Sequence, residues 1–273
     1  MKLFKAKAVS VPYLIWMAIF IIAPLVLVGI FALTDAEGSF TIENLSGIGR
    51  FTPVFARSIW LAAIATAICL LIAFPMAFAI SRMSERRQNL FLMLVMLPMW
   101  MNFLLRTYAW MSLLENNGLI NRFFGLFGIG PFQMINTQGA VVLGMVYNYL
   151  PFMILPLYSV MTKIDNSVIE AAQDLGASNG KVFSKVIIPL AVPGITTGIT
   201  MVFVPSISTF IISRMLGGGG NLLIGDLIEM QFLGNSYNPH LGSAMALVLM
   251  VIVLFTMSIT SSIDSEELED MLI

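Results

Sequence analysis

Charged residues are scarce in this 273-residue chain. Asp, Glu, Lys and Arg make up 11% of the sequence, against about 25% in an ordinary soluble domain. Hydrophobic residues make up 58%, a balance that indicates a protein of the lipid bilayer. The formal net charge is −1, and no basic cluster is interleaved with aromatic residues, so we expect no nucleic-acid partner.

Cysteine and histidine each occur once, which excludes several kinds of chemistry. Cys69 lies in an apolar run and has no second cysteine for a disulfide or a thiolate metal site. His240 follows Pro239 and is expected as a solvated loop residue without a partner for triad or metal chemistry. We therefore expect no catalytic residue, no metal site and no cofactor bound by this chain, which is not expected to be an enzyme.

Long apolar stretches are abundant, and six of them have the length of about 20 residues that a membrane-spanning helix needs. Barrel strands would be shorter and would alternate between polar and apolar residues. The expected fold class is an all-α membrane protein, a single domain over residues 1–273 with six transmembrane helices. The expected spans are Val11 to Leu33, Val54 to Ile80, Asn89 to Leu114, Gln138 to Met161, Ile187 to Ser213 and Leu241 to Ile263.

Lysine and arginine indicate the orientation of these spans. Most of the 14 lie before the first span or in the segments that follow the second and the fourth. The positive-inside rule places those segments in the cytoplasm, so both termini are expected there. On the opposite side we expect a short amphipathic helix near Leu119 to Phe127 and a long loop from Arg214 to His240.

Most of the 12 prolines fall within the expected spans or at their edges. An interior proline frees a backbone carbonyl and kinks its helix. In a bilayer the freed group must face protein or water, which favours a bundle around a cavity. Ordinary packing kinks are the alternative.

The polar segment after the fourth span, residues 162–186, is patterned as two short helices. Asp165 or Asn166 is available to cap the first helix, and Gly176 would end it in a left-handed conformation. The second helix would place Phe183 on one face. Such a segment could enter a groove on another protein, or lie on the membrane surface as a connector. The first helix carries an apolar stripe at helical spacing, formed by Ile164, Val168, Ala171 and Leu175.

The same segment carries a long, gapped motif. Glu170, Ala171 and Ala172 are followed after three residues by Gly176, and after nine more by Val186 to Pro189. The chain therefore resembles the permease subunits of binding-protein-dependent ABC importers, whose signature is EAA, Gly and then I-x-L-P at these spacings. Val186 in place of Ile and Ile188 in place of Leu are conservative departures.

The resemblance implies a type I ABC importer transmembrane domain in a bacterial inner membrane. It implies three partners: a homologous second permease, an ATPase dimer on the cytoplasmic side that binds ATP and magnesium, and a periplasmic substrate-binding protein. Segment 162–186 would seat in the ATPase and transmit its closure to the helices. The implied ATPase-coupling residues are Glu170, Ala171, Ala172, Leu175, Gly176 and Phe183.

Aromatic and acidic side chains toward the outer side are candidates for a substrate pathway. Aromatic faces and spaced carboxylates suit an elongated polycation, whereas an interfacial aromatic belt would explain the rings equally well. Arg106 opposes a cation pathway unless it pairs with an acid or points away from the cavity. The candidates are Tyr108, Trp110, Glu115, Tyr147, Tyr149, Asp226 and Glu229.

Three further stretches indicate which solute is transported. They are RTYAW from Arg106, NNGLIN from Asn116, and LGGGGNLLIGDLIEMQF from Leu216. They resemble the permeases of spermidine/putrescine importers, which implies polyamine transport by alternating access coupled to ATP hydrolysis. Importers for iron(III) or phosphonates share the architecture and remain alternatives. A secondary transporter that needs no ATPase is the rival from another class.

Overall fold

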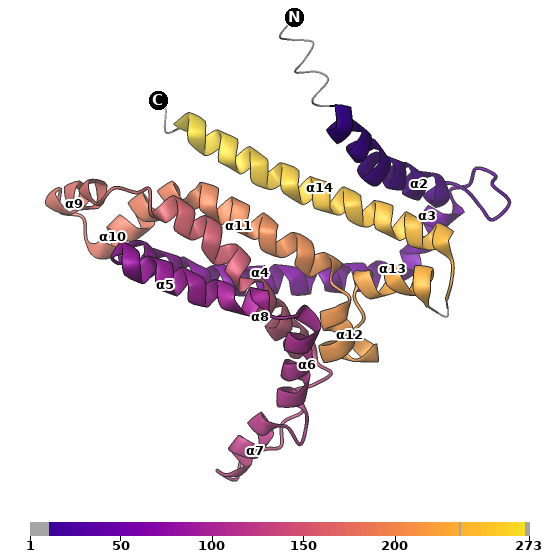
Figure 1. The fold of residues 1–273 in the computed structure, drawn as a ribbon, viewed down its shortest axis with the longest axis horizontal. Coiled ribbons are helices and arrows are strands. Elements are labelled where there is room, and N and C mark those ends of the chain that lie inside the picture. The colour runs from indigo at the N-terminus through magenta and orange to yellow at the C-terminus, as the bar shows by residue number, and fades with distance from the viewer. Residues whose placement is uncertain (1–10, 235, 271–273) are drawn as a thin grey trace, which may run out of the picture. The chain divides into compact units, whose positions relative to one another are not determined.

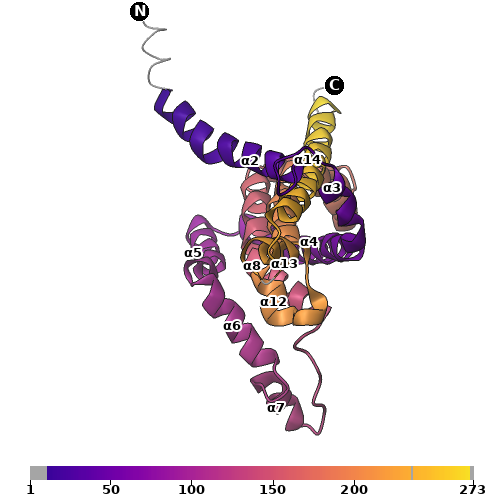
Figure 2. The ribbon, with the colours of Figure 1, turned by 90° about the vertical axis from the view of Figure 1, so that its right-hand side faces the viewer.

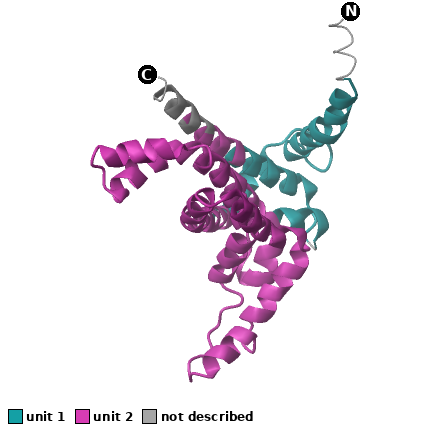
Figure 3. Ribbon diagram, turned by 60° about the vertical axis from the view of Figure 1, so that its left-hand side comes forward, with its two compact units in different colours: residues 1–53, 227–252 teal, residues 54–226, 253–273 magenta. Residues whose placement is uncertain are grey.

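The computed structural model describes residues 11–234 and 236–270. Within these ranges the regular secondary structure is helical, apart from one isolated antiparallel bridge between Thr34 and Phe40. The prediction of an all-α protein is therefore confirmed. The helices form two compact units, residues 1–53 with 227–252 and residues 54–226 with 253–273 (Figure 3).

In the smaller unit, a helical stretch over residues 11–17 continues through a π-helical turn, η1 (Ala18–Ile22), into α2 (Ala23–Ala32). Two short helices, α3 (Glu43–Gly47) and η2 (Ile48–Phe51), follow. The first residues of α14 (Pro239–Asp270) also belong here. His240 is thus a helix residue rather than a loop residue: its Nδ1 lies 3.1 Å from the carbonyl oxygen of Phe31, and the two rings meet edge to face.

The core of the larger unit is built on α4 (Thr52–Ser81), α8 (Gln138–Met161) and α11 (Ile188–Ser208) (Figure 1). Helices α8 and α11 pack closely because Gly194 has no side chain. A Cβ atom at Gly194 would lie 3.0 Å from the carbonyl oxygen of Pro156 and 3.1 Å from the Cα of Leu157. Gly198, four residues later, faces Met153. Apolar side chains gain little by leaving lipid, so membrane helices associate through close backbone packing. Small residues at this spacing permit that packing.

The stretch from Asn89 to Leu114 differs from the expected straight span. It contains α5 (Glu85–Met96), the 3₁₀ turn η3 (Leu97–Trp100) and α6 (Phe103–Leu114), with a bend of 88° at the break (Figure 1). Pro98 lies in the 3₁₀ turn, and the Asn102 side chain accepts hydrogen bonds from the N–H groups of Leu104 and Leu105, which starts a new helix. Helix α7 (Leu119–Gly125) follows α6 (Figure 2), where a short helix was expected.

The described chain contains five helices that are long and apolar enough to cross a membrane, or six if the bent pair counts as one span. The segment expected as a loop from Arg214 to His240 is largely helical. It contains α12 (Ile211–Gly217), η5 (Gly219–Asn221) and α13 (Ile224–Leu233). Gly218, with φ of +63°, lies at the break between α12 and η5, and Leu222 and Leu223 connect η5 to α13.

The two π-helical turns have a common origin in proline. The first, η1, ends two residues before Pro24, and the second, η4 (Phe183–Ile187), ends two residues before Pro189. A proline ring clashes with the carbonyl four residues earlier and lacks an N–H to bond with it. A wider turn relieves that clash, which explains why the helix from α10 (Asn179–Val182) to α11 continues without a break.

Candidate functional site

The motif segment folds as expected at the first of its two helices. Helix α9 spans Asn166–Asp174, and the Asp165 side chain caps it by accepting a hydrogen bond from the N–H of Ser167 at 2.9 Å. The backbone N–H and hydroxyl of Ser167, together with the charge of Arg82, lower the pKa of Asp165. The cap therefore stays ionised at neutral pH, where its negative charge favours the helix N-terminus.

Gly176 ends α9 in the left-handed conformation that the sequence predicts, with φ of +83°. The N–H of Gly176 bonds to the carbonyl of Gln173, and the N–H of Ala177 bonds to the carbonyl of Ala172. This pair of bonds is a Schellman motif, which satisfies carbonyls at the end of the helix. The chain then turns tightly into α10.

The two faces of α9 have different surroundings. Ile169 and Ala172 pack against the core of the larger unit. Glu170, Ala171 and Leu175 are exposed, and Leu175 retains 89% of its accessible surface. The predicted apolar stripe is therefore divided: Ile164 is buried within the chain, whereas Val168, Ala171 and Leu175 face outward. An exposed apolar face on a short capped helix is suited to a groove on a partner.

Phe183 contacts this chain's own helix α4. Its ring meets those of Phe74 and Phe78 edge to face, with centroids 5.3 and 6.4 Å away. Arg82, the residue directly after the end of α4, lies over the Phe78 ring and donates hydrogen bonds to the start of α9. Phe74, Phe78 and Arg82 were not among the predicted coupling residues, although the spacing of four residues places Phe74 and Phe78 on one helix face.

The aromatic candidates lie in two places. Trp110 on α6 and Tyr147 on α8 meet edge to face, with centroids 5.4 Å apart. Both line an apolar groove of about 730 Å³, together with residues of α4 such as Trp60 and Ile64. Tyr149 is buried on another side of α8, where its hydroxyl donates to the carbonyl of Pro205 at 3.4 Å.

The remaining candidates on α6 point elsewhere. Tyr108 is half exposed, and Glu115 is an exposed residue at the C-terminal end of the helix. Arg106 is buried, with its guanidinium over the Phe103 ring at 5.8 Å. Within the described residues, its Nε and Nη1 have no hydrogen-bond acceptor. The acid that would neutralise Arg106 on a cation pathway is thus not supplied by the described part of this chain.

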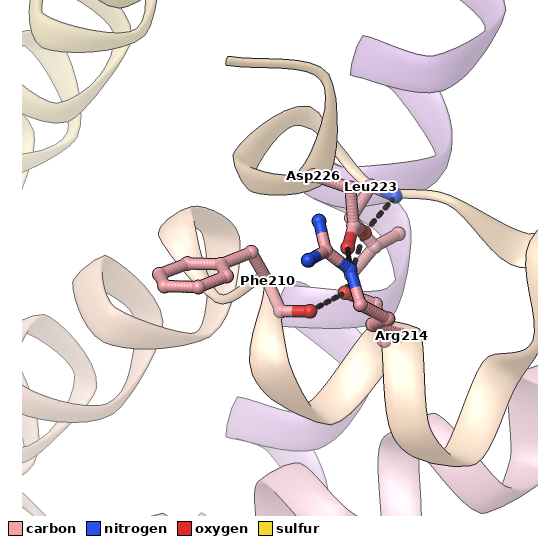
Figure 4. A network of polar contacts seen from close by, with 5 residues as sticks. Phe210, Arg214, Leu223 and Asp226 are labelled. Atoms are coloured by element: carbon pink, nitrogen blue, oxygen red, sulfur yellow. Dashed lines mark hydrogen bonds and ion pairs between the residues drawn. The ribbon is translucent and has the colours of Figure 1, made fainter. Parts of the chain in front are cut away.

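Asp226 is fully buried and held by its own surroundings (Figure 4). Its Oδ2 accepts hydrogen bonds from the Ser213 hydroxyl at 2.6 Å and from the N–H of Leu223 at 2.8 Å. Its Oδ1 lies 3.8 Å from Nε of Arg214, whose side chain is about half exposed. Asp226 caps the N-terminus of α13, and Glu229, one turn later, is partly exposed. A role of these two residues in substrate passage stays a prediction.

No group of three or more His, Cys, Asp or Glu side chains that could hold a metal ion occurs among the described residues. The site consists instead of a capped, outward-facing helix pair at one end of the helical bundle and aromatic and acidic groups on other helices of it. Together with the five or six helices of the described chain that are long and apolar enough to cross a membrane, these features indicate a membrane permease domain.

Residues 6–265 match the family of binding-protein-dependent transport system inner membrane components, and the chain belongs to that family. It is similar to a spermidine/putrescine transport system permease protein, PotB, of Haemophilus influenzae, with 40% identity over 255 residues and 88% of each chain covered. It is therefore a multi-pass inner-membrane transport subunit.

Two solved structures are similar in fold. The first is a bacterial ABC transporter involved in the import of the acidic polysaccharide alginate, with a TM-score of 0.78 at 16% identity, covering 95% of this chain and 96% of the other. The second is the alginate ABC transporter in complex with an alginate pentasaccharide-bound periplasmic protein, with a TM-score of 0.72 at 16% identity, covering 94% and 92%. The fold is that of a type I ABC transporter membrane domain, as the sequence predicts.

Proposed function

We propose that this chain is the permease subunit of an ATP-driven importer and that α9 is the element that docks on its ATPase. The observation that carries the proposal is the division of α9 into two faces. Ile169 and Ala172 fix the helix to its own bundle, while Glu170, Ala171 and Leu175 remain exposed. A docking helix would present such a face to a groove on its partner, whereas a connector on the membrane surface would turn it toward lipid.

The partners follow from this assignment. An ATPase dimer would supply ATP and magnesium, because this chain is proposed to bind neither. A homologous second permease would complete the pathway, and a periplasmic binding protein would deliver the substrate, as in the alginate transporter complex. If the bent pair counts as one span, the number of spans in the described chain is six, and docking of α9 on a cytoplasmic ATPase would then put both termini in the cytoplasm as well.

The cargo proposed is a polyamine, spermidine or putrescine, in line with the relative from Haemophilus influenzae. Trp110 and Tyr147 offer ring faces and edges beside an apolar groove, where the methylene segments of a polyamine could pack. Glu115 and Glu229 keep exposed surface for ammonium groups. Ammonium ions are attracted by aromatic faces and by carboxylates.

Competition uptake tests the cargo. The complete importer, reconstituted in vesicles with its binding protein and ATP, is given labelled spermidine together with unlabelled putrescine or a ferric chelate. We expect unlabelled putrescine to reduce spermidine uptake and the chelate to leave it unchanged. Uptake that is blocked by the chelate, or labelled iron that enters in place of spermidine, would assign the importer to another solute.

A further inference from the structure

Two side chains on one face of α4 and the residue after the helix lie near the motif segment. Phe74 and Phe78 are four residues apart, so they share a helix face, and Arg82 follows Phe78 by another four residues. Helix α4 ends at Ser81, directly before Arg82. This end of α4 therefore lies at the point where the transmembrane bundle meets segment 162–186.

Arg82 is joined to the start of α9. Its Nη1 donates hydrogen bonds to the carbonyl oxygen of Ile164, at 3.0 Å, and to the side-chain oxygen of Asn166. A cation beside a helix N-terminus opposes the helix macrodipole, but the charge of Arg82 also favours the ionised Asp165 cap. The pair of directed bonds fixes the position of the first turn of α9 relative to the last turn of α4.

Phe78 joins the two halves of the segment. The Arg82 guanidinium lies 5.4 Å from the centroid of the Phe78 ring, and the Phe183 ring approaches the same residue edge to face. One α4 side chain thus contacts both the arginine that holds α9 and the phenylalanine that begins the π turn after α10. We name Phe74, Phe78, Arg82 and Phe183 the α4 clamp.

The clamp matters because the segment is not packed continuously on the bundle. A cavity of about 370 Å³ lies between them, lined by Phe78, Phe183, Ile169, Gln173, Val182 and Ile187. If only loose packing held the segment, a movement of α9 could close the cavity and leave α4 where it is. Hydrogen bonds and ring contacts at the edge of the cavity would make α4 move together with α9.

We propose that Arg82 and Phe78 are positioning residues that transmit displacement of α9 to α4 during transport. This inference rests on the proposed function, in which α9 docks on an ATPase. Arg82 does not contact substrate or nucleotide in this scheme; it acts through Asn166 and the carbonyl of Ile164. Loss of the clamp should therefore leave docking and hydrolysis intact and reduce the amount of substrate moved per ATP.

The test uses the complete importer in vesicles, with spermidine uptake and ATP hydrolysis measured in the same sample. Arg82→Gln is expected to assemble, to hydrolyse ATP, and to lower uptake per ATP by about five-fold or more. Asn166→Ala removes the other end of one bond and should act in the same direction. The double variant should be no worse than Arg82→Gln, because both changes break one connection. Arg82→Lys should restore part of the uptake.

Arg86→Gln is the matched control, since Arg86 is an exposed arginine at the start of α5 and the change removes the same charge. Its uptake per ATP should equal that of the unmodified importer. If Arg82→Gln does not assemble, Asn166→Ala decides, because its exposed position makes it compatible with folding. Unchanged uptake per ATP in Arg82→Gln or in Asn166→Ala, or additive losses in the double variant, would overturn the proposal. An unmodified complex that transports without hydrolysis would overturn the proposed function instead.

Discussion

Asp226 is a buried carboxylate whose oxygens are in contact with groups of the same chain. Two hydrogen-bond donors, the Ser213 hydroxyl and the N–H of Leu223, meet at one of its oxygens, and Arg214 lies near the other. A substrate ammonium that approached Asp226 would have to compete with Arg214. The residue is thus tied to the local fold of α12 and α13 as well as to any role in substrate passage.

Asp226→Ala is expected to lower stability, because it leaves the buried Leu223 N–H without its acceptor and leaves the Ser213 hydroxyl only the carbonyl of Phe210. A buried polar group left unpaired costs about 1–3 kcal/mol. Thermal unfolding of the purified importer in detergent measures the effect as a lower Tm. Glu115→Gln is the control, since Glu115 is an exposed carboxylate at the C-terminal end of α6; it should change Tm little. An unaltered Tm in Asp226→Ala would rule out the capping role.

At the scale of the element, α9 depends on its two ends. Asp165 caps the first turn, and Gly176 closes the last one at a φ of +83°, which L side chains rarely adopt. Between them the helix has only nine residues, too few to be stable by itself in water. Its order therefore comes from the two caps and from contacts with the rest of the chain.

Gly176→Ala should destabilise the end of α9, because a left-handed conformation costs a residue with a side chain about 1–2 kcal/mol. We expect faster amide hydrogen exchange in α9 and lower spermidine uptake, with the transmembrane helices still protected. Gly180→Ala is the matched control: Gly180 has no positive φ, and its added Cβ would meet nothing within 4 Å. Equal exchange rates in the two variants would contradict the role assigned to the Gly176 turn.

At the scale of the whole molecule, the docking proposed for the exposed face of α9 would distinguish an importer subunit from a self-sufficient transporter. A secondary transporter would carry its own coupling-ion site and would work alone. An importer permease needs its ATPase, because the energy for transport enters through the docked element rather than through the membrane domain. The family to which the chain belongs and the exposed face of α9 agree on the second alternative.

Purification from membranes of cells that express the complete importer tests this distinction. We expect ATPase subunits to remain bound to the unmodified chain and to be lost from Glu170→Lys, which reverses a charge on the exposed face of α9. Lys163→Glu reverses an exposed charge outside that helix and should retain the ATPase. Spermidine uptake into vesicles by the purified chain alone would identify it as a secondary transporter.

Much of the fold could be predicted because each signal is local. Apolar length indicated the helices, and the helix expected from Gln138 to Met161 has those bounds in the structure. The left-handed Gly176 was predicted for the same reason, since glycine alone tolerates that conformation without strain. The break between α5 and α6 was not predicted. Pro98 and Asn102 cause it through the backbone, whereas the spans were predicted from the length of apolar stretches alone.

The sequence by itself determined the fold class, the family and the position of the motif segment, because periodicity, composition and spacing are properties of neighbouring residues. Tertiary structure alone decided which face of α9 is exposed, which groups hold Asp226, and that Arg82 and Phe78 connect α4 to the segment. These facts depend on contacts between different helices or helix ends: Ser213 and Asp226 are 13 positions apart, and the side chains of Arg82 and Asn166 interact across 84 positions of sequence. No local pattern records such a pairing, since the helices must first pack before the two side chains can meet.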